Sequence, residues 1–505
     1  MEYIAFFIVL TIIIITIFYF IEYLINKFRE HKMVKKCPGP KAYPLIGNMH
    51  LFIGDLKDVT DKLIQFSAIY SSPWRFWMGL KLALVFDDLE NIEILLQNSK
   101  TYEKSFIYNF MKDTLGDGLL TAPASLWKIH RRILDPKFNS KNISCHMESL
   151  NKNSKRLINI LETRNGENVD IFHYVHLCTL DMIFDSLLES DLNLQNTPDC
   201  KLDKYVKDVM NITMERMSKL WLYPNIIFKN SSLGKRLHEN LAYINNIKSK
   251  IIRKKKKSIE EEKFTSEGNG LYANKVENTS PFLDALFESF YETGEYSEEN
   301  IRHEMNTFIF AGSDTAAGTL TFLFLILASF PEVQNKVYKE LYDMYGSSNQ
   351  NDDPITYDDT KNMKYLERVI KETLRLFPPA PIVSRKMQKD TKVNDNIVVP
   401  KNTALFFSIY TLHRKDKYWT DPLRFNPDRF LPGNYDPKCF IPFGFGKRGC
   451  IGKFFAMAQM KTIVASLLRK FTVEIDNQVS VENVSLKLCI TLKTAETILL
   501  RFIRR

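Results

Sequence analysis

The chain has 505 residues, more than the roughly 250 to 300 at which one hydrophobic core usually stops growing. It therefore folds as several domains or as one unusually large domain. An apolar fraction of 45% and a charged fraction of 25% exclude intrinsic disorder, collagen and coiled coil for the bulk of the chain. The net charge of +10 is modest for this length and no compact basic and aromatic array stands out, so we expect no nucleic acid partner.

The seven cysteines are scattered and include no C-x-x-C pair, which argues against a disulfide framework and against a zinc ribbon. They stand at positions 37, 145, 178, 200, 439, 450 and 489. The sequence also lacks an H-E-x-x-H pattern. We therefore expect any metal to enter through a cofactor or a single protein ligand.

Residues 1–36 are predicted to form a transmembrane anchor with a basic stop segment. Nineteen uncharged residues run from Tyr3 to Ile21, about the length that crosses a ~30 Å hydrocarbon layer as a helix. A cleaved signal peptide is the alternative, but the run has no basic segment before it and no small-residue cleavage site. The basic residues that follow predict a cytosolic location for the rest of the chain; they are Lys27, Arg29, Lys32, Lys35 and Lys36.

A proline-rich hinge is predicted over residues 37–47, followed by one large, mainly α body with small β-sheets over residues 48–505. Short strands are expected at Trp74 to Met78 and Leu82 to Phe86, and helices dominate from 90 to about 345. The lysine-rich and then Gly/Asn/Ser-rich stretch from Arg253 to Pro281 is predicted to be an exposed loop, with a solvated lysine face favoured over a lipid-binding one.

A long helix is predicted from the cap residue Ser297 to Phe330, because acidic residues occupy its first turn and Pro331 follows its end. Further helices are expected over about 360 to 376 and 451 to 470. Strands are expected near 382 to 409 and toward Arg505, and a coil is expected from 420 to 440.

A glycine-dense loop at 443 to 452 places one cysteine at the start of the last helix. The pattern F-x-x-G-x-R-x-C-x-G is filled by Phe443, Gly446, Arg448, Cys450 and Gly452. The helix N-terminus and Arg448 both favour a thiolate, so we expect an easily ionised thiol. The glycines allow a large planar group to approach the sulfur closely.

On this loop the chain resembles the haem-thiolate monooxygenases, the cytochrome P-450 family. The resemblance implies the fold of that family, with haem b (iron protoporphyrin IX) as the cofactor. Cys450 would be the axial thiolate ligand of the haem iron, and Phe443, Gly446 and Arg448 would contribute to cofactor binding.

The long helix contains Ala311-Gly312-Ser313-Asp314-Thr315, a polar interruption in an apolar run. Serine and threonine in helices often bond back to a carbonyl one turn earlier, which is the structural alternative. The stretch matches the oxygen-activation motif of the family. By that resemblance Thr315 is the hydroxyl that supports protonation of the bound dioxygen, and Asp314 is part of the proton supply.

Haem also carries two propionates, which need donors. Trp127 and Arg131 match the family's W-x-x-x-R pattern, and Arg385 and Arg448 are further candidates for the propionates.

Glu372, Arg375 and Arg429 match the family's Glu-Arg-Arg network. This network would be a buried ion cluster that stabilises the fold without a catalytic role.

Gly-Leu-Leu-Thr at 118 to 121 and His-Arg-Arg at 130 to 132 are most similar to the microsomal family-four branch. Many members of that branch have a glutamate, esterified to haem, where this chain has Ala311. We therefore expect noncovalent haem.

The resemblance implies a monooxygenase that inserts one oxygen atom of dioxygen into a lipophilic substrate. NADPH electrons would come from a flavoprotein reductase, with cytochrome b5 as a further partner, on the cytosolic face of the endoplasmic reticulum. Surface lysines near the cysteine loop could steer the reductase; these are Lys438, Lys447 and Lys453. The alternatives are a haem-thiolate isomerase or dehydratase and a non-catalytic haem or ligand carrier. The substrate pocket is expected at 105 to 121, at Ala311 to Thr315, at Pro381 to Val383 and near Cys489.

Overall fold

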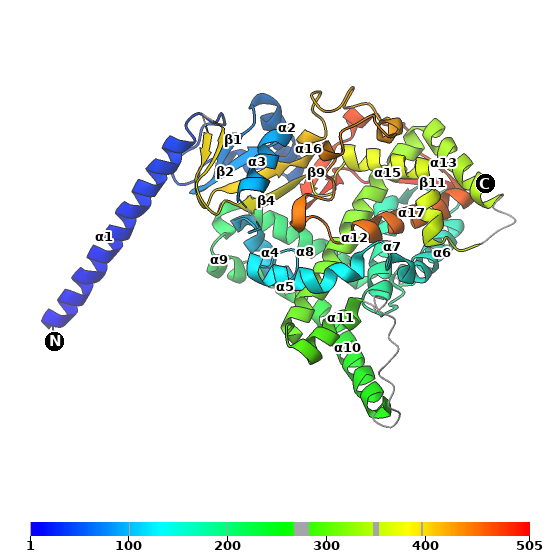
Figure 1. The fold of residues 1–505 in the computed structure, drawn as a ribbon, viewed down its shortest axis with the longest axis horizontal. Coiled ribbons are helices and arrows are strands. Elements are labelled where there is room, and N and C mark those ends of the chain that lie inside the picture. Colours follow the sequence, from blue (N-terminus) through cyan, green and yellow to red (C-terminus); the bar gives the residue numbers. More distant parts are fainter. Residues whose placement is uncertain (1, 100–101, 198, 267–281, 347–352, 395–396) are drawn as a thin grey trace.

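The structure is a computed structural model that describes residues 2–99, 102–197, 199–266, 282–346, 353–394 and 397–505. Helices make up most of the described chain (Figure 1). Their bounds are α1 (Glu2–Met33), α2 (Leu56–Ile69), α3 (Leu89–Ser99), α4 (Asn109–Leu115), α5 (Ala124–Leu134), α6 (Met147–Thr163), α7 (Ile171–Ser186), α8 (Lys201–Ser218), α9 (Asn225–Asn230), α10 (Ser232–Ser266), α11 (Phe282–Glu288), α12 (Glu298–Ser329), α13 (Pro331–Tyr345), α14 (Tyr357–Asn362), α15 (Lys364–Leu376), α16 (Ile409–Leu412) and α17 (Lys453–Lys470).

The strands form small sheets, as the sequence predicted. Their bounds are β1 (Trp74–Met78), β2 (Lys81–Phe86), β3 (Val169–Asp170), β4 (Ile382–Lys386), β5 (Thr391–Asn394), β6 (Ile397–Val399), β7 (Ala404–Ser408), β8 (Phe471–Glu474), β9 (Leu486–Cys489), β10 (Thr491–Thr494) and β11 (Leu499–Arg504). The largest sheet has the order β1-β2-β7-β4, with β2 and β7 parallel and the other pairs antiparallel. It lies at the end of the body from which α1 projects (Figure 1).

The long helix α12 is the centre of the main hydrophobic core, and its predicted start and end are confirmed. Ser297 accepts a hydrogen bond from the backbone N–H of Asn300, whose side chain accepts one from the N–H of Ser297, so two free donors are satisfied. The helix is long and apolar enough to cross a membrane, but 83% of its most apolar stretch is buried in the protein. It is therefore a core helix, and it packs most extensively against α7.

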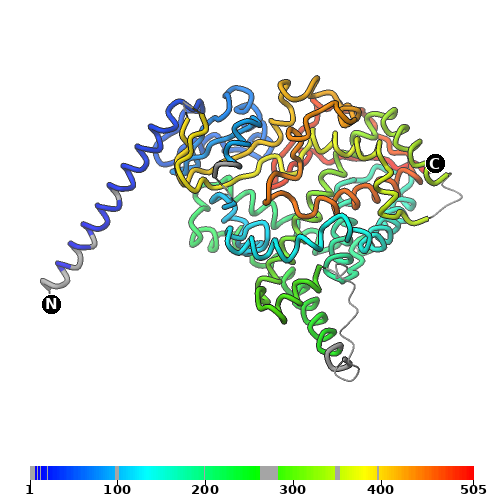
Figure 2. Tube along the Cα trace, viewed as in Figure 1, coloured from blue at the N-terminus to red at the C-terminus, as the bar shows by residue number. Residues whose placement is uncertain are grey.

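Helix α1 stands away from the body as a single rod (Figures 1 and 2). It includes the predicted anchor, and large apolar side chains along it, such as Phe6 and Phe18, are exposed. Its C-terminal end contacts the body, where His31 stacks on Trp77 with ring centres 4.4 Å apart. An exposed apolar surface of this kind requires a partner that removes it from water.

The prediction of a loop from Arg253 to Pro281 is wrong for residues 253–266, which continue α10; residues 267–281 lie outside the described residues. The lysines that suggested a loop pair with acids: Lys255 contacts Glu189 at 2.7 Å and Lys256 contacts Glu298 at 2.5 Å. Charge pairing with neighbouring elements lets the helix extend through a stretch that looks unstructured by composition.

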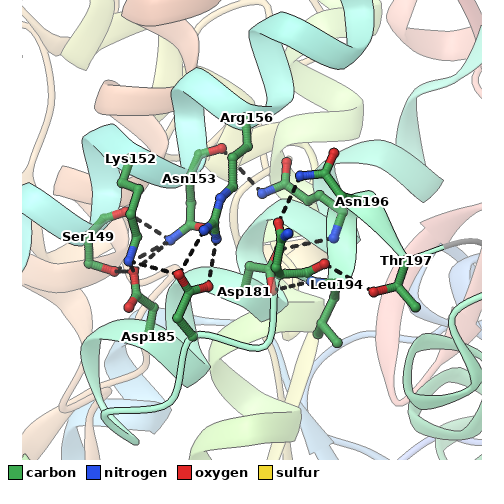
Figure 3. A network of polar contacts seen from close by, with 12 residues as sticks. Ser149, Lys152, Asn153, Arg156, Asp181, Asp185, Leu194, Asn196 and Thr197 are labelled. Carbon is green, nitrogen blue, oxygen red and sulfur yellow. Dashed lines mark hydrogen bonds and ion pairs between the residues drawn. The ribbon is translucent and has the colours of Figure 1, made fainter.

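A polar network ties α6 to α7 beside the central helix (Figure 3). Asp185 accepts hydrogen bonds from Ser149 and Asn153 and pairs with Lys152 at 2.6 Å. Asp181 accepts the backbone N–H of Leu194 at 2.7 Å, which fixes the loop after α7. The network holds in place the helix against which α12 packs.

The predicted Glu-Arg-Arg cluster is confirmed. Glu372 accepts hydrogen bonds from Arg375 Nε at 2.7 Å and Arg429 Nε at 3.2 Å, and also from the backbone N–H of Asn426. Arg375 donates in addition to the carbonyl of His413. Every charge in the cluster is buried and has a partner within the protein.

Candidate functional site

A cavity of about 510 Å³ lies between α12, α5, the large sheet and the cysteine loop. Its lining is mostly apolar and includes most of the predicted pocket: residues 107–120 in part, Ala311, Gly312 and Thr315, and Pro381 to Val383. Cys489 itself lines a second cavity, and its neighbours Leu488 and Ile490 line this one. The prediction for the pocket is therefore confirmed in all four regions, although Ser313 and Asp314 within the predicted helix stretch do not line the cavity.

Cys450 faces the cavity at the turn before α17. Its backbone N–H donates to the carbonyl of Phe443 at 2.7 Å, which closes the loop, and a side chain at Gly452 would lie within 3.9 Å of its sulfur. The residue is exposed and lines the cavity. The geometry leaves the sulfur available to a group in the cavity.

The expectation of an easily ionised thiol is wrong for the protein without a metal. Burial raises the pKa of the Cys450 thiol, and the opposing effects of the Gly452 N–H, Arg131 and Lys453 are smaller. Arg448 lies elsewhere, with its guanidinium against Trp127 at 4.4 Å. Because a bound metal ion deprotonates a coordinating thiol outright, thiolate formation here would depend on the metal.

Phe443 and Gly446, the remaining loop residues predicted to bind the cofactor, differ in whether they line the cavity. Phe443 lines the cavity, as expected for a residue beside a cofactor. Gly446 does not line it: the residue has φ +61 and opens the short 3-10 turn that leads to Arg448. Its role is to permit this turn, since the left-handed region favours glycine.

All four residues predicted to meet propionates line the cavity: Trp127, Arg131, Arg385 and Arg448. Arg131 donates to the carbonyl of Gly449 at 2.8 Å and pairs with Asp135 at 2.5 Å. Arg448 donates to the carbonyls of Tyr102, Leu119 and Ala122. The predicted donors are therefore brought together from α5, β4 and the cysteine loop.

A third cation, the partly buried Lys104, joins the buried Arg385 and the partly buried Arg448 at the cavity, and sequence reasoning missed it. Burial and the charges of the two arginines lower the pKa of Lys104 well below its usual value. Burial, then Arg385, lowers the pKa of Arg448 to about 9, with a smaller opposing effect from Glu103. Within the described part of the chain, none of the three forms an ion pair with a carboxylate.

These residues fit haem. Three crowded, buried or partly buried cations without a carboxylate partner favour an anion, because charges removed from water are stabilised by a counter-charge, and two propionates would supply it. The same cavity presents a single sulfur from Cys450 and an apolar wall for a planar macrocycle. Lys104 gave no signal in the sequence, because a lysine next to Glu103 looks like an ordinary surface pair.

Some residues of the predicted motif in α12 line the cavity, and others lie in the protein interior. Thr315 lines the cavity, and its hydroxyl donates to the Ala311 carbonyl at 2.8 Å, the back-bond of the structural alternative. At Gly312 a side chain would meet Ile183 of α7 at 2.5 Å, so glycine allows the two helices to pack closely.

Asp314, which the resemblance makes part of the proton supply, does not line the cavity itself. It is buried, accepts Thr491 Oγ1 at 2.5 Å and pairs with Lys493 at 2.6 Å. Burial alone would raise the pKa of Asp314, but Lys493, His176 and Thr491 together lower it. Thr491 and Lys493 were also missed by sequence reasoning, since they come from a distant hairpin.

A mostly helical body with one cysteine facing an apolar cavity that is rich in cations defines a haem-thiolate enzyme. The model of the cytochrome P450 family matches residues 37–501. The chain belongs to the cytochrome P450 family, and it is a haem-thiolate monooxygenase.

The curated relatives support the predicted family-four resemblance. Cytochrome P450 4V2 of Mus musculus is 33% identical over 466 residues, which cover 89% of this chain and 87% of the mouse protein. Cytochrome P450 4V2 of Homo sapiens is 32% identical and cytochrome P450 4c3 of Drosophila melanogaster is 31% identical, with 88% and 89% of this chain covered and 86% of each relative.

Proposed function

We propose that the chain inserts one oxygen atom of dioxygen into a lipophilic small molecule, such as a fatty acid, terpenoid, hormone or xenobiotic, using electrons that originate from NADPH. The observation that supports this substrate class is the cavity itself, whose lining near Ala311, Thr315 and Pro381 to Val383 is predominantly apolar. An apolar pocket with few polar groups favours ligands of matching surface.

Haem, when bound, supplies the redox chemistry that activates dioxygen. Cys450 would be its axial ligand, and Trp127, Arg131, Arg385, Arg448 and Lys104 would hold the propionates. The apolar wall excludes bulk water from the substrate, and Thr315 holds a hydroxyl at the cavity surface. Because Ala311 offers no carboxylate, we propose that the haem is held without a covalent bond.

Electrons would be delivered by an NADPH-dependent flavoprotein reductase, with cytochrome b5 as a further donor. Lys438, Lys447 and Lys453 are exposed around the cysteine loop, which supports an acidic partner at this face. Lys438 already pairs with Glu93 at 3.1 Å, so Lys447 and Lys453 are the better candidates for steering.

We further propose that residues 1–36 anchor the protein in the endoplasmic reticulum membrane as a single span, followed by a hinge at 37–47 and a cytosolic catalytic domain at 48–505. The exposed apolar surface of α1 supports this proposal. The basic residues that follow it favour the cytosolic side.

Replacement of Cys450 tests the proposal most directly. In Cys450→Ser, the reduced carbon monoxide complex is expected to lose its red-shifted Soret band, because a hydroxyl is a poor substitute for the thiolate. Cys439→Ser is the matched control, since Cys439 is buried and does not line the cavity. An unchanged thiolate-type band in Cys450→Ser would contradict the assignment.

Turnover assays separate the remaining functions. A monooxygenase requires NADPH and reductase, an isomerase or dehydratase turns over peroxides without them, and a carrier turns over nothing. Fatty acids, terpenoids and xenobiotics are screened by binding-induced haem spectral shifts and then by product analysis.

Thr315→Ala is expected to divert NADPH electrons into peroxide, and unaltered coupling of NADPH to product would count against the role of the Thr315 hydroxyl.

A further inference from the structure

Glu304 lies on α12, wholly buried and outside the cavity lining. The two oxygens of its side chain contact two different segments. Oε1 accepts from Nδ1 of His130 on α5 at 2.7 Å, and Oε2 accepts from the backbone N–H of Leu119 at 3.0 Å. Leu119 belongs to the loop of residues 116–122 between α4 and α5. The side chain therefore joins three segments: α12, α5 and this loop.

The 116–122 loop lies directly on α12. A side chain at Gly118 would meet the Thr307 hydroxyl at 2.2 Å and the His303 carbonyl at 2.5 Å, so only glycine permits this approach. The backbone N–H of Asp117 donates to His303 Nδ1 at 3.2 Å. Close packing and polar contacts together fix the loop on the helix.

The carbonyls of this loop hold Arg448, one of the residues predicted to meet the haem propionates. The Leu119 carbonyl accepts from Arg448 Nη1 at 3.3 Å, and the Ala122 carbonyl accepts from Nη2 at 2.8 Å. Leu119 therefore contacts the guanidinium through its carbonyl and Glu304 through its N–H. Because the loop lies between helices, the position of its carbonyls depends on the contacts that fix its backbone.

On α5, the second contact of Glu304 lies next to two further propionate candidates. His130 precedes Arg131 and comes one turn after Trp127, and both of those neighbours line the cavity. The ring of His130 is wholly buried and stacks on Tyr296 with ring centres 4.3 Å apart. The stack and the hydrogen bond hold the ring from two directions, and with it the turn of α5 that carries the two candidates.

We propose that Glu304 is a positioning residue for the haem, which sets the positions of the propionate donors without touching the cofactor. One route runs through Leu119 to Arg448, and the other runs through His130 to α5. The proposal rests on the haem-thiolate function above. Donors that are already in place lose less conformational freedom when the ligand binds, so a fixed set of donors holds haem more tightly.

The test compares Glu304→Ala with Asp203→Ala in the complete, haem-containing enzyme. Asp203 is the matched control because it is also a buried acid that accepts from a buried histidine, but it lies on α8 and holds α7. In Glu304→Ala, haem should transfer to excess apomyoglobin at least about tenfold faster, the size expected when a buried donor loses its partner.

Spectra of the same variants show whether the haem itself senses the change. The resonance Raman bands of the propionates should shift in Glu304→Ala, because the donors around them move. The reduced carbon monoxide complex should keep its red-shifted Soret band, since Cys450 is not altered. Asp203→Ala should match wild type in the propionate bands and in the rate of haem release.

Two further variants separate position from charge. In Glu304→Gln, the amide oxygen can accept from the Leu119 N–H and the amide nitrogen can donate to His130 Nδ1. Wild-type bands and haem release should therefore return although the charge is gone. His130→Phe keeps a ring against Tyr296 but removes the donor, so it should shift the propionate bands less than Glu304→Ala, which loses both contacts.

Unshifted propionate bands with unchanged haem release in Glu304→Ala overturn the proposal. Equal effects in Glu304→Ala and Asp203→Ala also overturn it, because they would show a purely structural role. If Glu304→Ala retains no haem, deuterium exchange of the full-length chain decides: faster exchange confined to residues 116–134 supports the proposal, and faster exchange throughout overturns it. Failure of the proposed function shows itself differently, as wild-type enzyme that forms no product with NADPH and reductase.

Discussion

The protein contains two clusters of charge, one buried around Glu372 and one buried or partly buried at the cavity, and they differ in the presence of a counter-charge. In the Glu372 cluster, Arg375 and Arg429 surround a carboxylate that accepts bonds from both. At the cavity, Lys104 and its two neighbouring arginines crowd together, and no acid among the described residues forms an ion pair with any of them.

The difference separates a structural site from a ligand site. A cluster that balances its own charge is complete when the chain folds, so it stabilises the fold and needs nothing more. A cluster with excess charge is incomplete until an anion arrives. The cations at the cavity therefore indicate a negatively charged ligand group, whereas the arginines beside Glu372 do not.

Breaking the balanced cluster is expected to give the largest effect. Glu372→Ala leaves two buried arginines without their acid, which should cost about 3 to 5 kcal/mol of the free energy of unfolding. Urea unfolding followed by circular dichroism measures this loss. The control Glu167→Ala removes an exposed acid that pairs with Arg164 and should change stability little. A loss in Glu372→Ala no greater than in the control would contradict the structural role.

Removing a cation from the unbalanced cluster should have effects of opposite sign on the fold and on haem binding. Lys104→Met relieves repulsion from Arg385 and Arg448, so the haem-free protein should gain about 1 kcal/mol or more of stability. Haem should leave the variant faster, as measured by its transfer to excess apomyoglobin. Lys112→Met removes a lysine on the nearby α4 that pairs with Asp117. It should change neither the stability of the haem-free protein nor the rate of haem release. A gain in the free energy of unfolding together with unchanged haem release would show that the cluster does not bind haem.

The sequence predicted the balanced cluster fully and the unbalanced one in part, for physical reasons. Motifs record residues at fixed spacings, so Glu372, Arg375 and Cys450 could be identified from local pattern. Lys104 could not, because its importance arises from the two arginines that folding brings next to it. The thiol pKa was predicted in the wrong direction, since the sequence shows nearby charges but not the desolvation that outweighs them.

The partners of Asp314 were equally hidden from sequence reasoning. The residue itself lies in a recognisable motif, but Thr491 and Lys493 are more than 170 positions away along the chain. The fold as a whole was easier to predict: caps, proline stops and periodicity gave α12 and the sheets, and the main error was the start of the loop at Arg253.

The unbalanced cluster should also change how stability depends on pH. The pKa of Lys104 is lower in the folded haem-free protein than its usual value of 10.5, so the unfolded chain binds the proton more tightly. The free energy of unfolding should then rise with pH between the folded value and 10.5. Urea titrations of haem-free protein should show this rise in wild type, and Lys104→Met should flatten it. Bound haem should flatten it too, because propionates restore the favourable environment of the charged lysine.

Asp314 lies between the two cases, because Lys493 balances its charge while its other partner, Thr491, lines the main cavity, and it should give the smallest effect. Because its pKa is lowered on folding, its contribution to stability is present above the unfolded pKa and is lost as pH falls through the folded value. Asp314→Asn should remove this loss of stability at acidic pH. The slope that disappears is at most about 1.4 kcal/mol per pH unit for one proton. Lys493→Met should reverse the sign of the pH dependence of the free energy of unfolding. Burial then dominates, and the buried carboxyl group favours its protonated form. Unfolding measured from pH 3 to pH 7 in both variants decides whether Lys493 is what keeps Asp314 ionised; identical pH profiles in Lys493→Met and wild type would assign that role to the rest of the network instead.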